Sequence, residues 1–173
     1  MLLKTSRLNI RYIEPDDWKS LLEIWKDFSQ SEFSQYDVPQ SLDEAEVREK
    51  AKLWAKVSPH QEQMFFAVCN QTEMLGYIEF HKNNDGYECG YCFHSKFHGM
   101  GYAKESMQMV MEWLSRDGGK QFSAGTALNN LPSVRLLTSL GFRKTGEEKV
   151  SFYKDEKGED IYFDGGIFTV YAG

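Results

Sequence analysis

The stretch Phe93-His-Ser-Lys-Phe-His-Gly99-Met-Gly101-Tyr-Ala-Lys104-Glu105 leads from a strand-like segment into a loop with two glycines and then into a helical pattern. Glycines let the backbone turn tightly and approach a ligand closely. The free N–H groups at a helix start favour an anion, and Lys104 adds a cation. The stretch therefore predicts an anion site at a strand-to-helix corner. The alternative is a glycine-rich corner with no ligand.

Two familiar phosphate-binding motifs are excluded here. The chain has no G-x-x-x-x-G-K-[ST] pattern, and Lys104 stands where G-x-G-x-x-G needs its third glycine. An anion in this loop would be held in some other way.

Upstream of the loop, apolar residues alternate with period two, which predicts strands separated by short turns. Short turns favour antiparallel pairing. The expected strands are Met64–Cys69, Met74–His81 and Tyr87–Phe93, with turns at residues 70–72 and 83–86.

Before these strands the pattern predicts one further strand and two helices. Leu8, Ile10 and Tyr12 alternate with polar residues, and an apolar stripe then runs over residues 18–28, with Asp16 placed to cap that helix. A second helix opens with Ser41-Leu-Asp-Glu44, a capping-box pattern.

Downstream, a helix with its apolar face over residues 103–114 ends at Gly118-Gly119. It is followed by a strand, Phe122–Leu128, and a short helix, Asn130–Leu140, that Gly141 terminates. The final strands are expected around Val150–Tyr153 and at Asp160–Phe163 with Ile167–Tyr171. The fold class is thus α/β (α+β): one domain, residues 1–173, whose mixed, mostly antiparallel sheet has about seven strands and about four flanking helices.

Composition limits the classes of protein to consider. Hydrophobic residues make up 41% of the 173 residues, too many for a disordered chain. The net charge of −6 argues against nucleic-acid binding, and no apolar run is long enough to span a membrane. The early turn to polar residues argues against a signal peptide, and three scattered cysteines favour reduced thiols. We expect a cytoplasmic protein, monomeric or homodimeric.

The charge is not evenly distributed. Residues 89–146 hold seven basic and three acidic residues, a local charge of +4, so the remainder carries −10. A cationic stretch suits a ligand with several phosphate charges. The acidic remainder would attract a cationic substrate, or it is an ordinary solvated surface.

A second pattern lies about 30 residues beyond the loop: Asn130-x-x-Ser133-x-x-x-Leu137-x-x-x-Gly141-Phe142. Together with Lys96-Phe-His-Gly99-Met-Gly101, it resembles the GNAT superfamily of acetyl-CoA-dependent N-acetyltransferases, in the branch similar to ribosomal-protein N-terminal acetyltransferases. Glu88-x-Gly-Tyr91 before the loop and Gly-Tyr-Ala-x-Glu after it match the same branch. The element order fits as well.

The resemblance implies an acetyltransferase that moves an acetyl group directly from acetyl-CoA, its cosubstrate, to a primary amine on a protein N-terminus or small molecule. Two splayed parallel strands would hold pantetheine along Cys92–His94, and the diphosphate would lie on the N–H groups of Gly99–Lys104. A backbone N–H near Phe93 would bind the oxyanion. The implied cofactor-binding residues are Cys92, Phe93, His94, Lys96, His98, Gly99, Met100, Gly101, Tyr102, Ala103, Lys104, Asn130 and Ser133.

The resemblance implies Glu88 as the general base, with Glu79 as the runner-up. Ser133 is the candidate proton donor to the thiolate, in addition to a role as cofactor ligand or helix cap. Tyr102 and Tyr153 are further candidate donors, because Leu137 stands where many relatives have the acidic tyrosine.

No metal site is predicted, because the histidines of the loop lack ligand partners at metal-binding spacing. Two alternatives to the enzyme stay open. One is a GNAT-fold module that binds coenzyme A without turnover, and the other is an unrelated anion-binding α/β protein. The acceptor cannot be read from the sequence.

Overall fold

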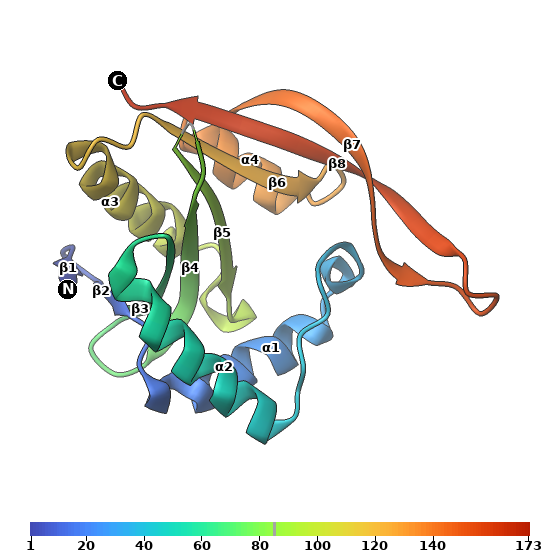
Figure 1. Cartoon of the computed structure of the whole chain (residues 1–173), viewed down its shortest axis with the longest axis horizontal. Helices are drawn as coiled ribbons and strands as arrows, with labels where there is room; N and C mark the ends of the chain where they lie inside the picture. Colours follow the sequence, from blue (N-terminus) through green and yellow to red (C-terminus); the bar gives the residue numbers. More distant parts are fainter. Residues whose placement is uncertain (85) are drawn as a thin grey trace.

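The computed structural model describes residues 1–84 and 86–173 and contains one eight-stranded sheet with four α-helices (Figure 1). The strand order is β1-β2-β3-β4-β5-β6-β8-β7, and every neighbouring pair is antiparallel except β5 with β6. The strands are β1 Leu2–Lys4, β2 Asn9–Tyr12, β3 Gln63–Cys69, β4 Met74–Lys82, β5 Tyr87–Phe93, β6 Gln121–Ala127, β7 Arg143–Lys154 and β8 Asp160–Tyr171. The helices are α1 Trp18–Ser29, α2 Glu44–Val57, α3 Tyr102–Arg116 and α4 Leu131–Ser139. The expected mixed, mostly antiparallel fold is confirmed.

The observed strands differ from the predicted ones at or next to the two edges of the sheet. β1 was not expected, because its three residues are too few to show a period. β7 begins at Arg143, seven residues before the predicted Val150, and β8 runs unbroken through Gly165 and Gly166. β7 is an edge strand and is mostly exposed on both faces, so its sequence lacks the apolar alternation of a half-buried strand. The predicted turn at 83–86 includes Asp85, which lies outside the described residues.

Two predicted helix caps are wrong. The residues Pro15–Asp17 form a 3₁₀ turn, and Asp17 rather than Asp16 is the residue that precedes α1. The Asp17 carboxylate accepts the Glu14 N–H at 2.7 Å and pairs with the Arg11 guanidinium at 2.7 Å.

At the second helix, α2 is capped by Asp43, not by Ser41. The Asp43 carboxylate accepts the N–H of Glu46 at 3.0 Å. The capping position therefore lies two residues later than the predicted capping box.

The core is divided between the two faces of the sheet. One face packs on α3 and α4 through residues such as Phe66, Ile78 and Phe80, and the other packs on α1 and α2 through Phe65 and Tyr77. This is the alternation that the period-two pattern predicts. The middle strands β3 and β4 are therefore buried on both faces.

The β5–β6 pair separates soon after it begins. Only Tyr87 with Phe122 and Glu88 with Ser123 are paired, although β5 continues to Phe93. β5 stays paired with β4 to its end, and β6 stays paired with β8, so the two strands diverge, as Figure 1 shows. At the fork, the Cys89 thiol lies 3.2 Å from the Ser123 carbonyl oxygen and donates to it. The divergence opens one edge of β5 next to the predicted loop.

Candidate active site

The open edge of β5 presents backbone groups to the gap between β5 and β6. His94 donates its N–H to the Leu75 carbonyl on β4 at 3.0 Å. Because backbone groups alternate in direction along a strand, the N–H and C=O of Phe93 point away from β4, toward the gap. His98 Nε2 donates to that Phe93 carbonyl at 2.8 Å. The Phe93 N–H is thus aimed where the sequence predicts an oxyanion donor.

The loop after β5 has the geometry of an anion site. Gly99 and Gly101 have φ values of +74° and +80°, a conformation that side chains rarely adopt. The Glu105 N–H donates to the Gly101 carbonyl at 3.0 Å. The N–H groups of Tyr102, Ala103 and Lys104 come earlier in the first turn, where a helix offers them no acceptor. Gly101 occupies the N-cap position and has no side chain to cap them. These amides and the helix dipole suit an anion.

The start of the loop is tied to α1. The Asp27 carboxylate accepts the Ser95 N–H at 2.7 Å and the Ser95 hydroxyl at 2.6 Å. His94 Nδ1 lies 3.7 Å from the same carboxylate. Burial would raise the pKa of Asp27, but the Ser95 hydrogen bonds outweigh it and lower the pKa. Asp27 stays ionised and anchors this turn.

Several side chains of the predicted cofactor set are engaged by the protein itself. Lys96 Nζ pairs with the Glu73 carboxylate at 2.8 Å. Asn130 Oδ1 accepts the Ser133 N–H at 3.2 Å and so caps α4. In the described residues, the side chains of Lys96 and Asn130 therefore make contacts within the protein. His98 does the same through its hydrogen bond to the Phe93 carbonyl. The backbone of the loop remains the main feature that can bind a ligand.

The two candidate bases lie on the same face of the sheet, near the fork. Glu88 belongs to the last β5–β6 pair and is exposed. Glu79, on β4, is opposite Gly90, and a Cβ at Gly90 would lie 2.8 Å from its Oε1. The missing side chain of Gly90 therefore gives the Glu79 carboxylate room over β5.

His81 interacts with Glu79 on that face. His81 Nε2 is 3.7 Å from Glu79 Oε2, and His81 is paired in register with Glu88. The nearby Glu79 carboxylate raises the pKa of His81, although burial acts in the opposite direction. Glu79 thus has a cationic partner whenever His81 is protonated.

Ser133 lies on the other face and contacts Tyr91, a residue of the Glu88-x-Gly-Tyr91 motif to which the sequence assigned no catalytic role. Its Oγ is 2.5 Å from the Tyr91 hydroxyl, and either atom can donate. Burial raises the pKa of Tyr91 well above its ordinary value, so this hydroxyl keeps its proton. Its contact with Ser133 joins positions 42 residues apart, so no short sequence pattern could reveal it.

The other candidate proton donors lie in different surroundings. Leu137 is fully buried in the core. Tyr153, on β7, donates to the Ser34 carbonyl at 3.2 Å, and the Tyr102 ring lies against Arg7 at 4.6 Å. Ser133 is therefore the candidate that the structure best places beside the open edge of β5.

The remaining observations concern metals and membranes. Within residues 1–84 and 86–173, no group of three or more His, Cys, Asp or Glu side chains can hold a metal ion. None of the helices in the described part of the chain is long and apolar enough to cross a membrane.

Comparison with known proteins is consistent with this geometry. The chain is 26% identical to the uncharacterized N-acetyltransferase YnaD of Bacillus subtilis, over 94% of this chain and 95% of that protein. It is 27% identical to the uncharacterized N-acetyltransferase p20 of Bacillus licheniformis, over 99% and 98%. Its fold matches RimL, a ribosomal L7/L12 alpha-N-protein acetyltransferase solved with coenzyme A, with a TM-score of 0.84, 18% identity and coverage of 99% and 98%.

The family model of the acetyltransferase (GNAT) domain matches residues 7–143, a span that includes the fork, the glycine loop and α4. The chain therefore belongs to the GNAT family of acetyltransferases.

Proposed function

We propose that this protein is an N-acetyltransferase that moves the acetyl group of acetyl-CoA directly to a primary amine, on a protein N-terminus or a small molecule. The observation that carries the proposal is the open edge of β5, which leads straight into a glycine loop and the uncapped start of α3. The GNAT family match and the coenzyme A bound to RimL support acetyl-CoA as the cosubstrate.

The cosubstrate supplies a thioester, a pantetheine arm and a diphosphate. We assign the arm to the backbone of Cys92–His94, which would bind it as an added strand. We assign the diphosphate to the N–H groups of Gly99–Lys104. The remaining residues of the proposed cofactor-binding surface are Lys96, His98, Asn130 and Ser133. The side chains of Lys96 and Asn130 are already bonded within the protein, so each would have to leave its present partner to bind the cosubstrate.

The transfer forms an N–C bond, breaks the C–S bond and moves two protons. One proton leaves the attacking amine, and Glu88 is the proposed base, acting directly or through a water. Glu79 is the second candidate, since its carboxylate lies over Gly90 and also faces the fork. The Phe93 N–H would donate to the oxygen that becomes negative during the transfer.

The second proton goes to the departing thiolate. We assign this step to Ser133, whose hydroxyl is supported by the protonated Tyr91. A serine alone is a weak acid, but a tyrosine hydroxyl at 2.5 Å stabilises a serine that has given up its proton. The Ser133–Tyr91 pair would thereby take the place of the acidic tyrosine that the family resemblance implies at the position of Leu137.

A second candidate function follows from Leu137. Because this position is apolar and buried, the protein would bind coenzyme A without turnover if Ser133 and Tyr91 do not deliver a proton. The two functions differ in whether thiol is released.

The test is an acceptor screen with the purified protein. Acetyl-CoA is incubated with peptides that have different N-terminal residues, polyamines, aminoglycosides and simple amines, and free thiol is measured. Amine-dependent thiol release supports the enzyme. Binding of coenzyme A by calorimetry with no release across the panel supports the non-catalytic module, and the absence of binding would overturn both.

A further inference from the structure

The glycine loop contains carbonyl groups as well as the amides that suit an anion. If the N–H groups at the start of α3 face an anion, the carbonyl groups between Gly99 and Gly101 cannot all face it. Because glycines restrict the backbone very little, a protein donor to one of these carbonyl groups would fix the direction of its peptide.

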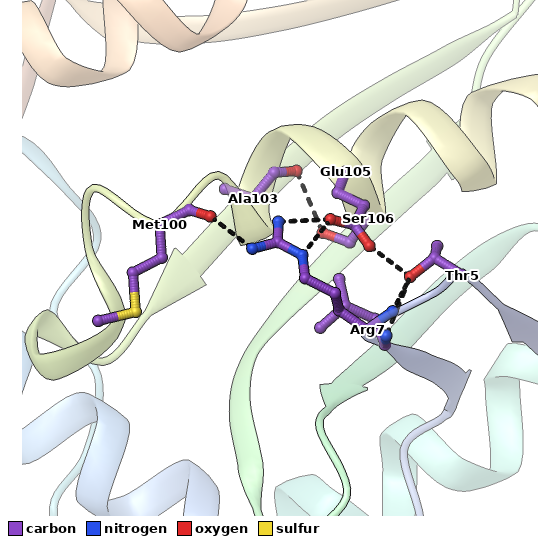
Figure 2. Close-up of polar contacts among 7 residues, drawn as sticks. Thr5, Arg7, Met100, Ala103, Glu105 and Ser106 are labelled. Carbon is purple, nitrogen blue, oxygen red and sulfur yellow. Dashed lines mark hydrogen bonds and ion pairs between the residues drawn. The ribbon is translucent and has the colours of Figure 1, made fainter.

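Arg7, between β1 and β2, supplies that donor. Its Nη1 donates to the Met100 carbonyl at 3.0 Å, and its Nε and Nη2 donate to Glu105 Oε2 at 2.9 and 2.5 Å (Figure 2). The guanidinium carbon lies 4.6 Å from the centre of the Tyr102 ring. One planar group thus touches the loop, the first residue of α3 and the first turn of that helix.

Arg7 is itself held in place by Thr5. The Thr5 hydroxyl accepts the N–H of Arg7 at 3.2 Å and that of Leu8 at 2.9 Å, and it donates to Glu105 Oε1 (Figure 2). Both carboxylate oxygens of Glu105 are therefore occupied by residues almost one hundred positions earlier in the chain. The N-terminal segment and α3 are joined at the anion site.

The contact also controls charge at this site. Glu105 is in the first turn of α3, where its negative charge would repel a bound diphosphate. Burial acts to raise the pKa of Glu105, but its bonds to Thr5 and Arg7 and the charge of Arg7 lower it, so the carboxylate is ionised. The positive charge of Arg7 compensates it at hydrogen-bond distance.

We propose that Arg7 is a positioning residue for the diphosphate of acetyl-CoA: it orients the Met100 peptide and neutralises Glu105 without touching the reacting atoms. This inference rests on the proposed binding of acetyl-CoA at the loop. It adds a part of the molecule, the segment between β1 and β2, to the cofactor site.

The first experiment measures coenzyme A binding by calorimetry for the wild type, Arg7→Met, Arg7→Lys and Arg7→Met/Glu105→Gln. We expect Arg7→Met to raise Kd roughly tenfold or more, because charge-assisted hydrogen bonds are lost. Arg7→Lys should fall between the wild type and Arg7→Met, since lysine keeps the charge but not the planar fork. The double variant should recover part of the affinity, because it removes the uncompensated carboxylate but does not restore the Met100 contact.

Arg48→Met is the matched control. Arg48 is an exposed arginine on α2 that also lies over an aromatic ring, Trp18 at 4.0 Å, and pairs with a glutamate at 3.9 Å. Its Kd should equal that of the wild type. Wild-type affinity in Arg7→Met would overturn the inference, and full recovery in the double variant would show that charge alone matters. If the wild type binds no coenzyme A, the proposed function itself fails.

The second experiment separates positioning from general loss of stability. With an amine found in the screen, Arg7→Met should raise KM for acetyl-CoA and leave kcat nearly unchanged. With S-acetylpantetheine, which has the thioester but no diphosphate, kcat/KM should be the same in Arg7→Met and the wild type. An equal loss with both thioesters would contradict the inference and indicate a structural role.

Discussion

The hydroxyl groups of Tyr91 and Ser133 meet at 2.5 Å across the boundary between β5 and α4. Tyr91 comes from the strand whose edge is open, and Ser133 comes from the first turn of the short helix. The contact therefore connects the Glu88-x-Gly-Tyr91 motif with the pattern that runs from Asn130 to Phe142.

Ser133→Ala should lower kcat by roughly 10²–10⁴-fold if Ser133 delivers the proton. Tyr91→Phe should lower kcat less and leave KM for acetyl-CoA nearly unchanged, because the serine remains. Steady-state kinetics with acetyl-CoA measure both effects. Tyr87→Phe, on the same strand, is the control, and a kcat reduced as much by Tyr87→Phe as by Tyr91→Phe would refute the assignment.

Gly99→Val should abolish coenzyme A binding and leave the fold intact. A Cβ at Gly99 meets no protein atom within 4 Å, so the expected effects are strain at φ +74° and obstruction of the ligand. The strain should reduce the free energy of unfolding by about 1–3 kcal/mol.

The chain offers a matched control for this change. Gly158, in the β7–β8 turn, has φ +82° and equally open surroundings, so Gly158→Val should lose similar stability and keep coenzyme A binding. Denaturant unfolding and calorimetry on both variants give the comparison. Retained binding in Gly99→Val would remove this loop from the site.

Glu88→Gln should lower kcat by roughly 10²–10⁴-fold and remove the acid-side limb of the pH–rate profile, because a general base is active only in its deprotonated form. Glu79→Gln is the parallel variant on the neighbouring strand. If the pH–rate profile is unchanged in Glu88→Gln but altered in Glu79→Gln, Glu79 is the base.

His81 should stabilise the protein in acid more than in alkali. Its pKa is raised from the ordinary 6.5 in the folded state, chiefly by Glu79, so the stabilisation is fully present below that value. It is lost as the pH rises through the raised pKa. The difference in free energy of unfolding between wild type and His81→Gln, measured from about pH 6 to pH 9, should therefore shrink as the pH increases. A constant difference would mean that the charge of His81 contributes nothing.

The strands that could be predicted from the sequence are those with buried apolar residues. β3, β4 and β5 are found within about a residue of their predicted ends, because alternating apolar residues such as Phe66 and Val68 pack against one helical layer. β7 lacks that alternation, since it lies at the edge of the sheet and both of its faces are largely exposed.

The site was predictable where it depends on local backbone geometry and not where it depends on distant partners. Gly99 and Gly101 have the positive φ values that their position before a helix requires. The pairing of Lys96 with Glu73 and of Arg7 with Glu105 joins residues far apart in the chain, and no short pattern encodes it. The roles of Glu88 and Ser133 remain predictions.

The early separation of β5 from β6 divides the sheet into two halves, β1 to β5 and β6 to β7. Beyond Glu88 and Ser123 the two halves share no strand pairing in the described residues, so the proposed site lies where the backbone of the sheet is open. A pantetheine arm lying along β5 would fill part of this opening, and the acetyl donor would then be a structural member of the sheet during each turnover. Amide hydrogen exchange along residues 90–93 should slow when coenzyme A is added, so the exchange rate would report directly whether the donor is bound.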